Sequence, residues 1–356
     1  MQWRVLRTWW TVDGDDRGKE ESVVREPTMA DIASYLGISR QLVSIVLRDM
    51  PGASEETRAR VKQAAQDLGY SPHQGARMLR QYTRRQLGVA FAPVHATEPD
   101  IVESIYAAAA GDRLQVVLSA KTEARTTERV IEELLEYRCA GLIVIGPELS
   151  DSALQTLAQR ARVPLVVVGQ GEFNEFYDVV RSAGDEGIEA IVRHVVTLGH
   201  RRPAYVNCAA MPPAGLRLTG YLRAMGDAGL RPDVIDVGGL DATEEAGTRA
   251  GGMLLQRRTL PTAVLSCNDQ VAVGLLQVLA RAGVAVPGEV SLTGFDDIRL
   301  ASLSSIDLTT VRQDPVEMGR AAVAAAVQRI GKPTAKPALY VVRPSLVIRG
   351  STSAPS

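Results

Sequence analysis

Residues 28–48, with the sequence TMADIASYLGISRQLVSIVLR, predict two short helices joined by a tight turn. Apolar residues recur at helical spacing in both halves of this stretch: Ile32, Ala33 and Leu36, then Val43, Val46 and Leu47. Gly37 stands between the halves, where a sharp reversal needs dihedral angles that glycine adopts without a Cβ penalty. This pattern is typical of a helix-turn-helix, whose second helix lies in the major groove of DNA.

Capping residues mark where each of these helices begins. Thr28 and Ser39 stand just before the two helices and can accept hydrogen bonds from free N–H groups, and Asp31 predicts a box-like partner for Thr28. Ser54 opens a third helix, which ends at Gly69. The apolar residues of this third helix repeat at helical spacing and are Val61, Ala64, Ala65 and Leu68. We therefore expect the third helix to cover the first two.

The length and the charge of the chain indicate more than one domain and one basic segment. With 356 residues and 46% hydrophobic content, the chain can bury a substantial core. Its net charge is −1, but residues 69–97 contain no carboxylate. This segment carries four arginines: Arg77, Arg80, Arg84 and Arg85. A basic segment in a neutral protein predicts one surface that faces a polyanion.

The cysteines and the N-terminus indicate the compartment. Cys139, Cys208 and Cys267 are far apart in sequence and odd in number, so they read as buried apolar residues and not as disulfides or metal ligands. Residues 1–26 lack periodicity and are predicted to be a disordered extension, as a start assigned too early would produce. Neither a signal peptide nor a membrane span is recognisable. We expect a soluble, cytoplasmic protein without a metal or cofactor.

From about Leu87 onward, short β-branched runs alternate with helical patterns. Eight apolar runs are predicted as strands, at residues 87–92, 115–118, 142–145, 165–168, 204–206, 234–237, 263–265 and 290–293. Helical segments between them include residues 101–110, 128–136, 186–198 and 270–282. Continuous apolar strands interleaved with helices favour parallel sheets covered on both faces, here as two successive α/β lobes. The cleft between such lobes is the expected ligand site.

Several motifs in order give the chain a resemblance to the LacI family of transcriptional regulators, from residue 28 to about residue 353. They lie at residues 28–39, 54–72, 76–80, 198–202 (LGHRR), 217–221 (RLTGY), 268–270 (NDQ), 294–297 (GFDD) and 346–352 (LVIRGST). The resemblance implies an all-α helix-turn-helix headpiece over residues 27–70 and a hinge helix with linker over 71–85. A two-lobed α/β core with parallel sheets, like a periplasmic binding protein, would follow over 86–353 for effector binding and dimerisation.

The outward face of the second helix is predicted to read DNA. It presents Arg40, Gln41, Ser44, Ile45 and Arg48. The helix caps Thr28 and Ser39 are further candidates for contact with DNA. Arginine can bind guanine O6 and N7, and glutamine can bind adenine N6 and N7. Ile45 cannot donate a hydrogen bond, so its expected contact is apolar, with a thymine methyl or a sugar. The plainer alternative is that Arg40 and Gln41 are only solvated helix-start residues.

The resemblance also implies a hinge helix over residues 71–80. Leu79 matches the family leucine that wedges between base pairs from the minor groove, and Arg77 and Arg80 would meet phosphates or the groove floor. Gly75 costs about 1 kcal/mol relative to alanine within a helix. A helix this short is marginal alone, so we expect it to form only when two hinges meet on DNA. A plain linker is the alternative.

The resemblance implies an effector site in the core. Arg217 matches a family arginine that forks onto ligand hydroxyls or a carboxylate, and Asn268 and Asp296 match polar residues that face the cleft. Such a set of donors and acceptors suits a sugar. Alternatively, Asp296 caps a turn and Asn268 caps a helix. Phe295, which precedes Asp296, is a further candidate or a core residue.

Other features leave the effector open. Phe173, with Phe176 and Tyr177, is predicted to lie on the connection between the lobes, as a stacking platform or a hinge-packing patch. Ala183-Gly184 replaces an acidic-amide pair of the family, and Gly169-Gln170-Gly171 replaces a charged residue. Residues 270–282 are predicted to be either a dimer contact or an ordinary core helix.

No catalytic motif supports an enzyme. The sequence after residue 168 lacks the third glycine of a dinucleotide site, and phosphate loop, G-x-S-x-G and paired metal-binding histidines are missing. The sequence therefore predicts a homodimeric repressor that binds double-stranded operator DNA under the control of a small molecule, with a sugar favoured. The alternative is a stand-alone sugar-binding protein of the periplasmic type, which leaves the headpiece unexplained.

Overall fold

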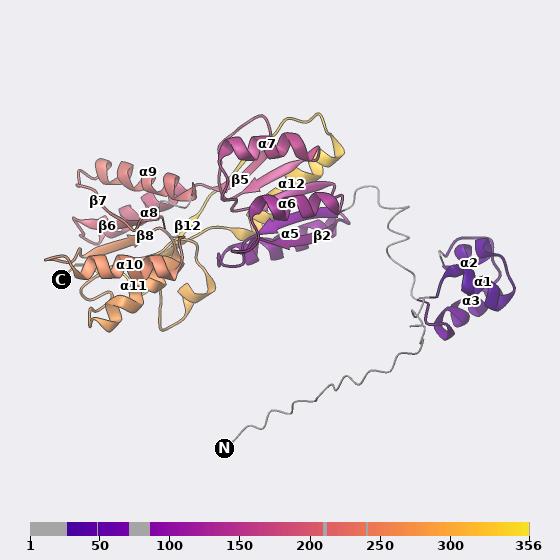
Figure 1. Ribbon diagram of the computed structural model, residues 1–356. Helices are drawn as coiled ribbons and strands as arrows, with labels where there is room; N and C mark the ends of the chain where they lie inside the picture. Colours follow the sequence, from indigo (N-terminus) through magenta and orange to yellow (C-terminus); the bar gives the residue numbers. More distant parts are fainter. Residues whose placement is uncertain (1–26, 48, 71–85, 209–211, 240, 356) are drawn as a thin grey trace, which may run out of the picture. The chain divides into compact units, whose positions relative to one another are not determined.

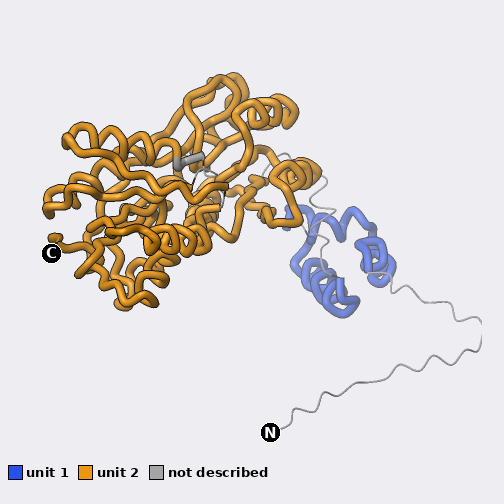
Figure 2. The backbone as a smooth tube through the Cα atoms, turned by 60° about the vertical axis from the view of Figure 1, so that its left-hand side comes forward, with its two compact units in different colours: residues 1–83 blue, residues 84–356 orange. Residues whose placement is uncertain are grey.

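The chain divides into two units, residues 1–83 and residues 84–356 (Figure 2). The computed structural model describes residues 27–70 and 86–355, except Arg48, residues 209–211 and Leu240 (Figure 1). The predicted disordered extension and hinge helix therefore lie outside the described residues, as do Arg48, Arg77, Leu79 and Arg80. Among the described residues, no helix is long and apolar enough to cross a membrane.

The N-terminal unit contains the predicted three helices, α1 (Met29–Leu36), α2 (Arg40–Leu47) and α3 (Glu55–Asp67). Thr28 and Asp31 form the capping box, and Gly37 adopts a left-handed φ of 65° at the turn. Ser39 Oγ accepts a hydrogen bond from Leu42 N at 3.2 Å, and Ser54 caps α3. Their shared core consists of Ile32, Ala33, Val43, Val46, Val61, Ala64 and Ala65. The predicted helix-turn-helix, with the third helix covering it, is confirmed.

The first lobe of the C-terminal unit is built on a six-stranded parallel sheet with the order β11-β5-β4-β3-β1-β2. Its strands are β1 (Gln86–Phe91), β2 (Gln115–Ala120), β3 (Gly141–Ile145), β4 (Leu165–Val168), β5 (Asp178–Ser182) and β11 (Leu339–Val342). Side chains of β3 alternate between the two faces, so Ile143 and Ile145 join one core, and Leu142 and Val144 join the other. Both faces are therefore covered, as the apolar runs predict.

Helices cover both faces of this sheet (Figure 1). α5 (Glu98–Gly111) and α12 (Pro315–Gly331) pack against each other over one face. α6 (Thr127–Glu136) and α7 (Asp151–Ala161) contribute to the core on the other face. α12 comes late in the sequence, after the second lobe. The chain therefore crosses back between the lobes, and this crossing segment contributes to the site.

The second lobe has a four-stranded parallel sheet with the order β7-β6-β8-β9. Its strands are β6 (Pro203–Asn207), β7 (Asp233–Asp236), β8 (Ala263–Ser266) and β9 (Ser291–Thr293). Two helix pairs pack on it, α8 (Gly184–Thr197) with α9 (Pro212–Asp227), and α10 (Glu244–Leu255) with α11 (Asp269–Arg281). The apolar residues of α11 are mostly buried within this lobe, which supports its interpretation as a core helix.

The chain crosses between the lobes three times. It passes from β5 to α8, from β10 (Thr310–Arg312) to α12, and from β11 to β12 (Ser345–Val347), which pairs with β10. A short 3-10 helix, η1 (Arg299–Ser302), precedes β10. All eight predicted strands are present. The prediction that the two lobes follow one another along the chain is wrong, because the chain returns to the first lobe after the second. The first lobe is completed by α12 and by the half-buried edge strand β11, which the sequence pattern does not mark.

Candidate functional sites

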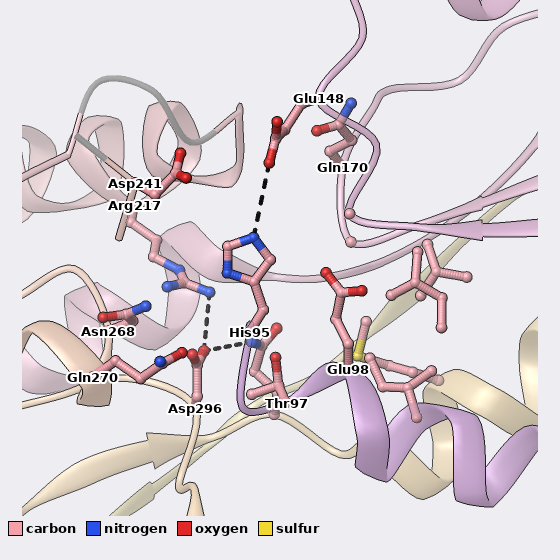
Figure 3. A pocket seen from close by; sticks show the side chains of 17 residues that line it. His95, Thr97, Glu98, Glu148, Gln170, Arg217, Asp241, Asn268, Gln270 and Asp296 are labelled. Atoms are coloured by element: carbon pink, nitrogen blue, oxygen red, sulfur yellow. Dashed lines mark hydrogen bonds and ion pairs between the residues drawn. The ribbon is translucent and has the colours of Figure 1, made fainter. Parts of the chain in front are cut away.

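A cavity opens between the two lobes of the C-terminal unit, beside the carboxyl ends of β1, β3 and β4 (Figure 3). Its empty volume is about 770 Å³, a figure that includes open solvent at its mouth. The first lobe contributes His95, Thr97, Glu98, Ile101, Ile145, Gly146, Glu148, Val168, Gly169, Gln170 and Met318. The second lobe and the crossing segment contribute Arg217, Asp241, Asn268, Gln270, Asp296 and Gln313. The expected position of a ligand site, between the lobes, thus coincides with a real cavity.

Arg217, on α9, is held in place from three directions. One of its terminal nitrogens donates to the carbonyl oxygen of Cys267, and the other donates to Asp296 Oδ1 at 3.2 Å. The guanidinium carbon lies 3.8 Å from the centre of the Phe295 ring, an arrangement that combines stacking with cation–π attraction. Only 4% of the side chain is exposed. The guanidinium group of Arg217 is therefore held in a fixed position at the cavity wall.

Asp296 lies opposite this arginine in a strained backbone conformation, with φ of 118°. Its Oδ1 also accepts a hydrogen bond from Gln313 Nε2 at 2.6 Å. Burial raises the pKa of Asp296, and the charge of Arg217 opposes that rise. Strain at a non-glycine residue concentrates at functional sites, because the surrounding structure must hold it. The aspartate is thus an oriented acceptor at the cavity.

Asn268 performs the helix-capping role that the sequence left open, and it also lines the cavity. Its Oδ1 accepts from Val271 N at 2.9 Å at the start of α11, and its Nδ2 donates to the carbonyl oxygen of Ala242 at 2.7 Å. The cap fixes the amide at the cavity wall, where one N–H of the amide group remains for a ligand.

The two predicted phenylalanines are placed differently. Phe295 is fully buried beneath Arg217, against Gly187, and it does not line the cavity. Phe173 is 61% exposed and also lies outside the lining. The prediction that Phe173, Phe176 and Tyr177 lie on the connection between lobes is wrong. They lie between β4 and β5, both of which are strands of the first lobe, and Tyr177 is packed into that lobe's core.

The second helix of the headpiece presents the predicted reading face. Arg40 and Gln41 are exposed, and Ser44 and Ile45 are half-buried, while Val43 on the opposite side is completely buried. The apolar residues of α2 pack inside the headpiece, so its polar face is accessible to a partner. The major groove of DNA is wide enough to admit an α-helix.

Comparison with known proteins matches both parts of the chain. Residues 28–73 match the model of the bacterial regulatory proteins of the lacI family, and residues 192–352 match the periplasmic binding protein-like domain. The transcriptional repressor PurR of Pasteurella multocida is 30% identical over 91% of this chain and 98% of its own length. The chain belongs to the lacI family.

Two further relatives extend this finding. The ribose operon repressor of Escherichia coli K12 is 30% identical over 91% of this chain and 99% of its own length. A crystal structure of the lac repressor dimer bound to operator and an anti-inducer is 27% identical and has a TM-score of 0.80, covering 93% of this chain and all of that one. This lacI-family member is a DNA-binding transcriptional regulator controlled by a small molecule, and not an enzyme. The alternative of a stand-alone binding protein is wrong, because the chain carries the family's headpiece.

The first-lobe wall of the regulator's cavity was not predicted from the sequence. Glu98, at the start of α5, is 4% exposed and accepts a hydrogen bond from Ala92 N at 2.6 Å. Burial raises its pKa to about 8. Glu148 and Gln170 lie beyond the ends of β3 and β4. Their positions in the sequence could have predicted this wall, because polar residues that directly follow parallel strands gather at one edge of a sheet.

His95 and Glu148 form a small polar cluster at the mouth of this wall (Figure 3). Their Nε2 and Oε1 atoms lie 4.0 Å apart, and Lys121 forms an ion pair with the same carboxylate. Burial lowers the pKa of His95 and so favours the neutral imidazole, while the charges of Glu148 and Asp241 oppose this shift. The cluster offers hydrogen-bonding groups and no free cation.

Gln270 joins the lobes through one amide group. Its Oε1 accepts from Ala96 N at 3.0 Å, and its Nε2 donates to the carbonyl oxygen of Val94 at 3.2 Å. The residue belongs to α11 in the second lobe, whereas residues 94 and 96 follow β1 in the first. This pair of hydrogen bonds ties the second lobe to the loop that carries His95.

Metal binding finds no support in the described part of the chain. No group of three or more histidine, cysteine, aspartate or glutamate side chains there is arranged to hold an ion. Cys208 and Cys267 are free, fully buried and in contact, with their sulfur atoms 3.2 Å apart. Buried thiols of this kind act as packing residues.

Proposed function

We propose that this protein is a homodimeric repressor whose affinity for a pseudo-palindromic operator is set by a small polar effector in the cavity. The observation that carries the proposal is one chain with both an exposed reading helix and a cavity holding the preorganised Arg217–Asp296 pair. The lac repressor dimer on operator supports the assembly. A two-fold dimer mirrors a two-fold operator. We place the protein in the cytoplasm, on the nucleoid when it is bound to DNA.

In this proposal the headpiece spans residues 27–70, the hinge and linker 71–85, and the effector core 86–353. Arg40, Gln41, Ser44, Ile45 and Arg48 contact base edges or nearby backbone, with Thr28 and Ser39 beside the phosphates. Arg77, Leu79 and Arg80 act in the minor groove. Arg217, Asp296 and Asn268 bind the effector, and Phe295 supports Arg217 from behind. The ribose operon repressor among the relatives supports a sugar-sized effector.

Coupling between cavity and operator requires only a modest free energy. A change of about 1–3 kcal/mol shifts operator affinity by roughly 5- to 150-fold. The segment that crosses from β10 to α12 carries Gln313, which donates to Asp296, so ligand contact at Asp296 acts directly on the connection between the lobes. The lobes could then change their relative position when the effector binds.

The proposal is tested by selecting bound duplexes from a random pool with the full-length protein. We expect a pseudo-palindromic site whose binding weakens steeply as salt rises, because phosphate contacts release counterions. Replacing Arg40 or Gln41 by alanine should cost about 1–3 kcal/mol of base discrimination at one position per half-site. Ile45→Arg should change the preferred base at one position. A protein that prefers no duplex over random DNA would contradict the proposal.

The matched control lies on the same headpiece. Lys62→Ala removes a charge from an exposed position of α3, away from the reading face. It should leave base preference unchanged while Arg40→Ala alters it. Equal effects of both changes would show that Arg40 contributes only charge and does not read a base.

A further inference from the structure

Two polar groups in the first-lobe wall of the cavity are buried with incomplete pairing. They are the carboxyl group of Glu98 and the amide oxygen of Gln170, which are 4% and 5% exposed. Both residues line the cavity, and Figure 3 shows Gln170 beside Glu148 and Glu98 beside Thr97. Buried polar groups are normally paired, so these two indicate a missing partner.

Glu98 is held close to the backbone of the cavity wall. Its Oε2 accepts from Ala92 N, and its Oε1 lies so near Gly146 that a Cβ there would be 2.5 Å away. Within the described residues Glu98 forms no ion pair. Lys121 is the cation whose charge acts on it, but Lys121 pairs with Glu148. The carboxyl group is thus positioned at the cavity without a counter-charge of its own.

The orientation of Gln170 is fixed by a neighbour that can only accept. Its Nε2 faces the carbonyl oxygen of Leu149 at 3.4 Å, so the amide cannot be flipped without setting two oxygens against each other. Its Oε1 has no hydrogen-bond partner among the residues described. The first-lobe wall therefore presents an amide oxygen without a donor and a buried carboxyl group without a cation.

The charges around the cavity select the kind of donor. Four carboxyl groups line it, those of Glu98, Glu148, Asp241 and Asp296. Arg217 is the one lysine or arginine in the described lining, and it is committed to Asp296, Cys267 and Phe295. The same lining contains no phenylalanine, tyrosine or tryptophan. An anion finds no spare cation here, and a planar base finds no stacking ring.

We propose that Glu98 binds the protonated amino group of a small polyhydroxylated effector, such as an amino sugar, and that Gln170 accepts a hydrogen bond from another donor of the same molecule. An ammonium group carries three donors and a positive charge, which matches a buried carboxyl group that has no cation of its own. The hydroxyl groups of the effector face Arg217, Asn268 and Asp296. This inference rests on the proposed function, in which the cavity holds the effector.

Binding of a cation at this position should release a proton. Without ligand, Glu98 is largely protonated at pH 7, because burial raises its pKa to about 8. The Ala92 N–H and Lys121 oppose that rise, and Glu148 adds to it. An ammonium group beside the carboxyl favours the ionised form, so ligand binding releases protons from Glu98.

The test measures calorimetric binding to the full-length protein at pH 7, in buffers of different ionisation enthalpy. The probes are glucosamine, galactosamine and mannosamine, each beside its parent sugar and its N-acetyl derivative, with glucose 6-phosphate as an anion. We expect one amine to bind at least about tenfold more tightly than its parent sugar and its N-acetyl derivative, with proton release. In Glu98→Gln both the preference for the amine and the proton release should disappear.

Glu189→Gln is the matched control, since Glu189 pairs with Arg223 on the surface of the second lobe. It should bind the amine as the parent protein does. The inference is overturned if no amine binds, if a neutral sugar or the phosphate binds best, or if Glu98→Gln keeps the amine preference. A neutral sugar that binds and alters operator affinity would overturn this inference while leaving the proposed function intact. Retained operator binding by Glu98→Gln shows that the variant is folded.

Discussion

The two walls of the cavity between the lobes differ in how completely their polar groups are paired. In the second lobe, Arg217, Asp296 and Asn268 are held by hydrogen bonds to one another or to the surrounding chain. In the first lobe, Glu98 and Gln170 retain unpaired acceptor capacity. The second wall is therefore already held in place by the protein itself. The first wall keeps acceptor atoms available, and our inference assigns them to the effector.

The largest effect is expected where the preorganised wall is broken. Arg217→Ala leaves the buried Asp296 without its cation, and breaking a buried pair in this way costs about 3–5 kcal/mol. Equilibrium denaturation measures the loss, and binding of any effector should disappear with it. Arg223→Ala is the control, because its ion pairs with Asp185 and Glu189 lie on the surface. An equal loss in both variants would contradict the assignment of Arg217 as a buried anchor.

The contribution of Glu98, in the first-lobe wall, to stability should depend on pH. Glu98 has a pKa of about 8 in the folded protein and 4.5 as its ordinary value, so the folded state binds more protons between these values. Stability then falls as pH rises through that window, by up to about 1.4 kcal/mol per unit. Glu98→Gln should remove this slope, so its stability relative to the parent increases from pH 5 to pH 8. Parallel stability curves for the two proteins would contradict the expectation.

Asn268→Ala tests whether the scaffold role of the second wall extends to the helix cap. The change removes the cap of α11 and leaves the buried carbonyl of Ala242 without its donor, so a loss of about 2 kcal/mol is expected. Ser150→Ala removes an exposed cap from α7 in the first lobe and should cost about 1 kcal/mol or less. Thermal denaturation of the two variants compares them directly.

The smallest effect is expected at the link between the walls. Gln270→Ala removes the hydrogen bonds to Val94 and Ala96, worth about 1 kcal/mol in total stability. Amide hydrogen exchange at Ala96 should nevertheless become faster, because its acceptor is gone. Gln277→Ala, at an exposed position of α11, should leave that exchange unchanged. Unaltered exchange in Gln270→Ala would show that the link is weak in solution.

Sequence reasoning found the second wall and missed the first for a physical reason. Arg217, Asn268 and Asp296 lie within short motifs, so each is recognisable alone. Glu98, Glu148 and Gln170 come after three different strands, and they meet only because those strands are parallel neighbours. Their proximity is a property of strand order, which the local pattern does not contain.

The misplaced aromatic residues have a similar cause. The sequence of β5, with Asp178 and Arg181 in its short span, does not resemble an apolar strand, so the pattern places Phe173 and Tyr177 after the last strand of the first lobe. Once β5 is recognised, the segment becomes a loop within the first lobe. The headpiece, by contrast, was predicted almost completely, because its caps, turn glycine and apolar stripes are all local signals.

The three crossings have a consequence for how the molecule is made. Helix α12 and strand β11, which complete the first lobe, are synthesised only after residues 184–312, which form most of the second lobe. Until then, one face of the first-lobe sheet is partly uncovered and β5 is an open edge strand. Truncation before residue 342 should therefore also destabilise the lobe that was translated first.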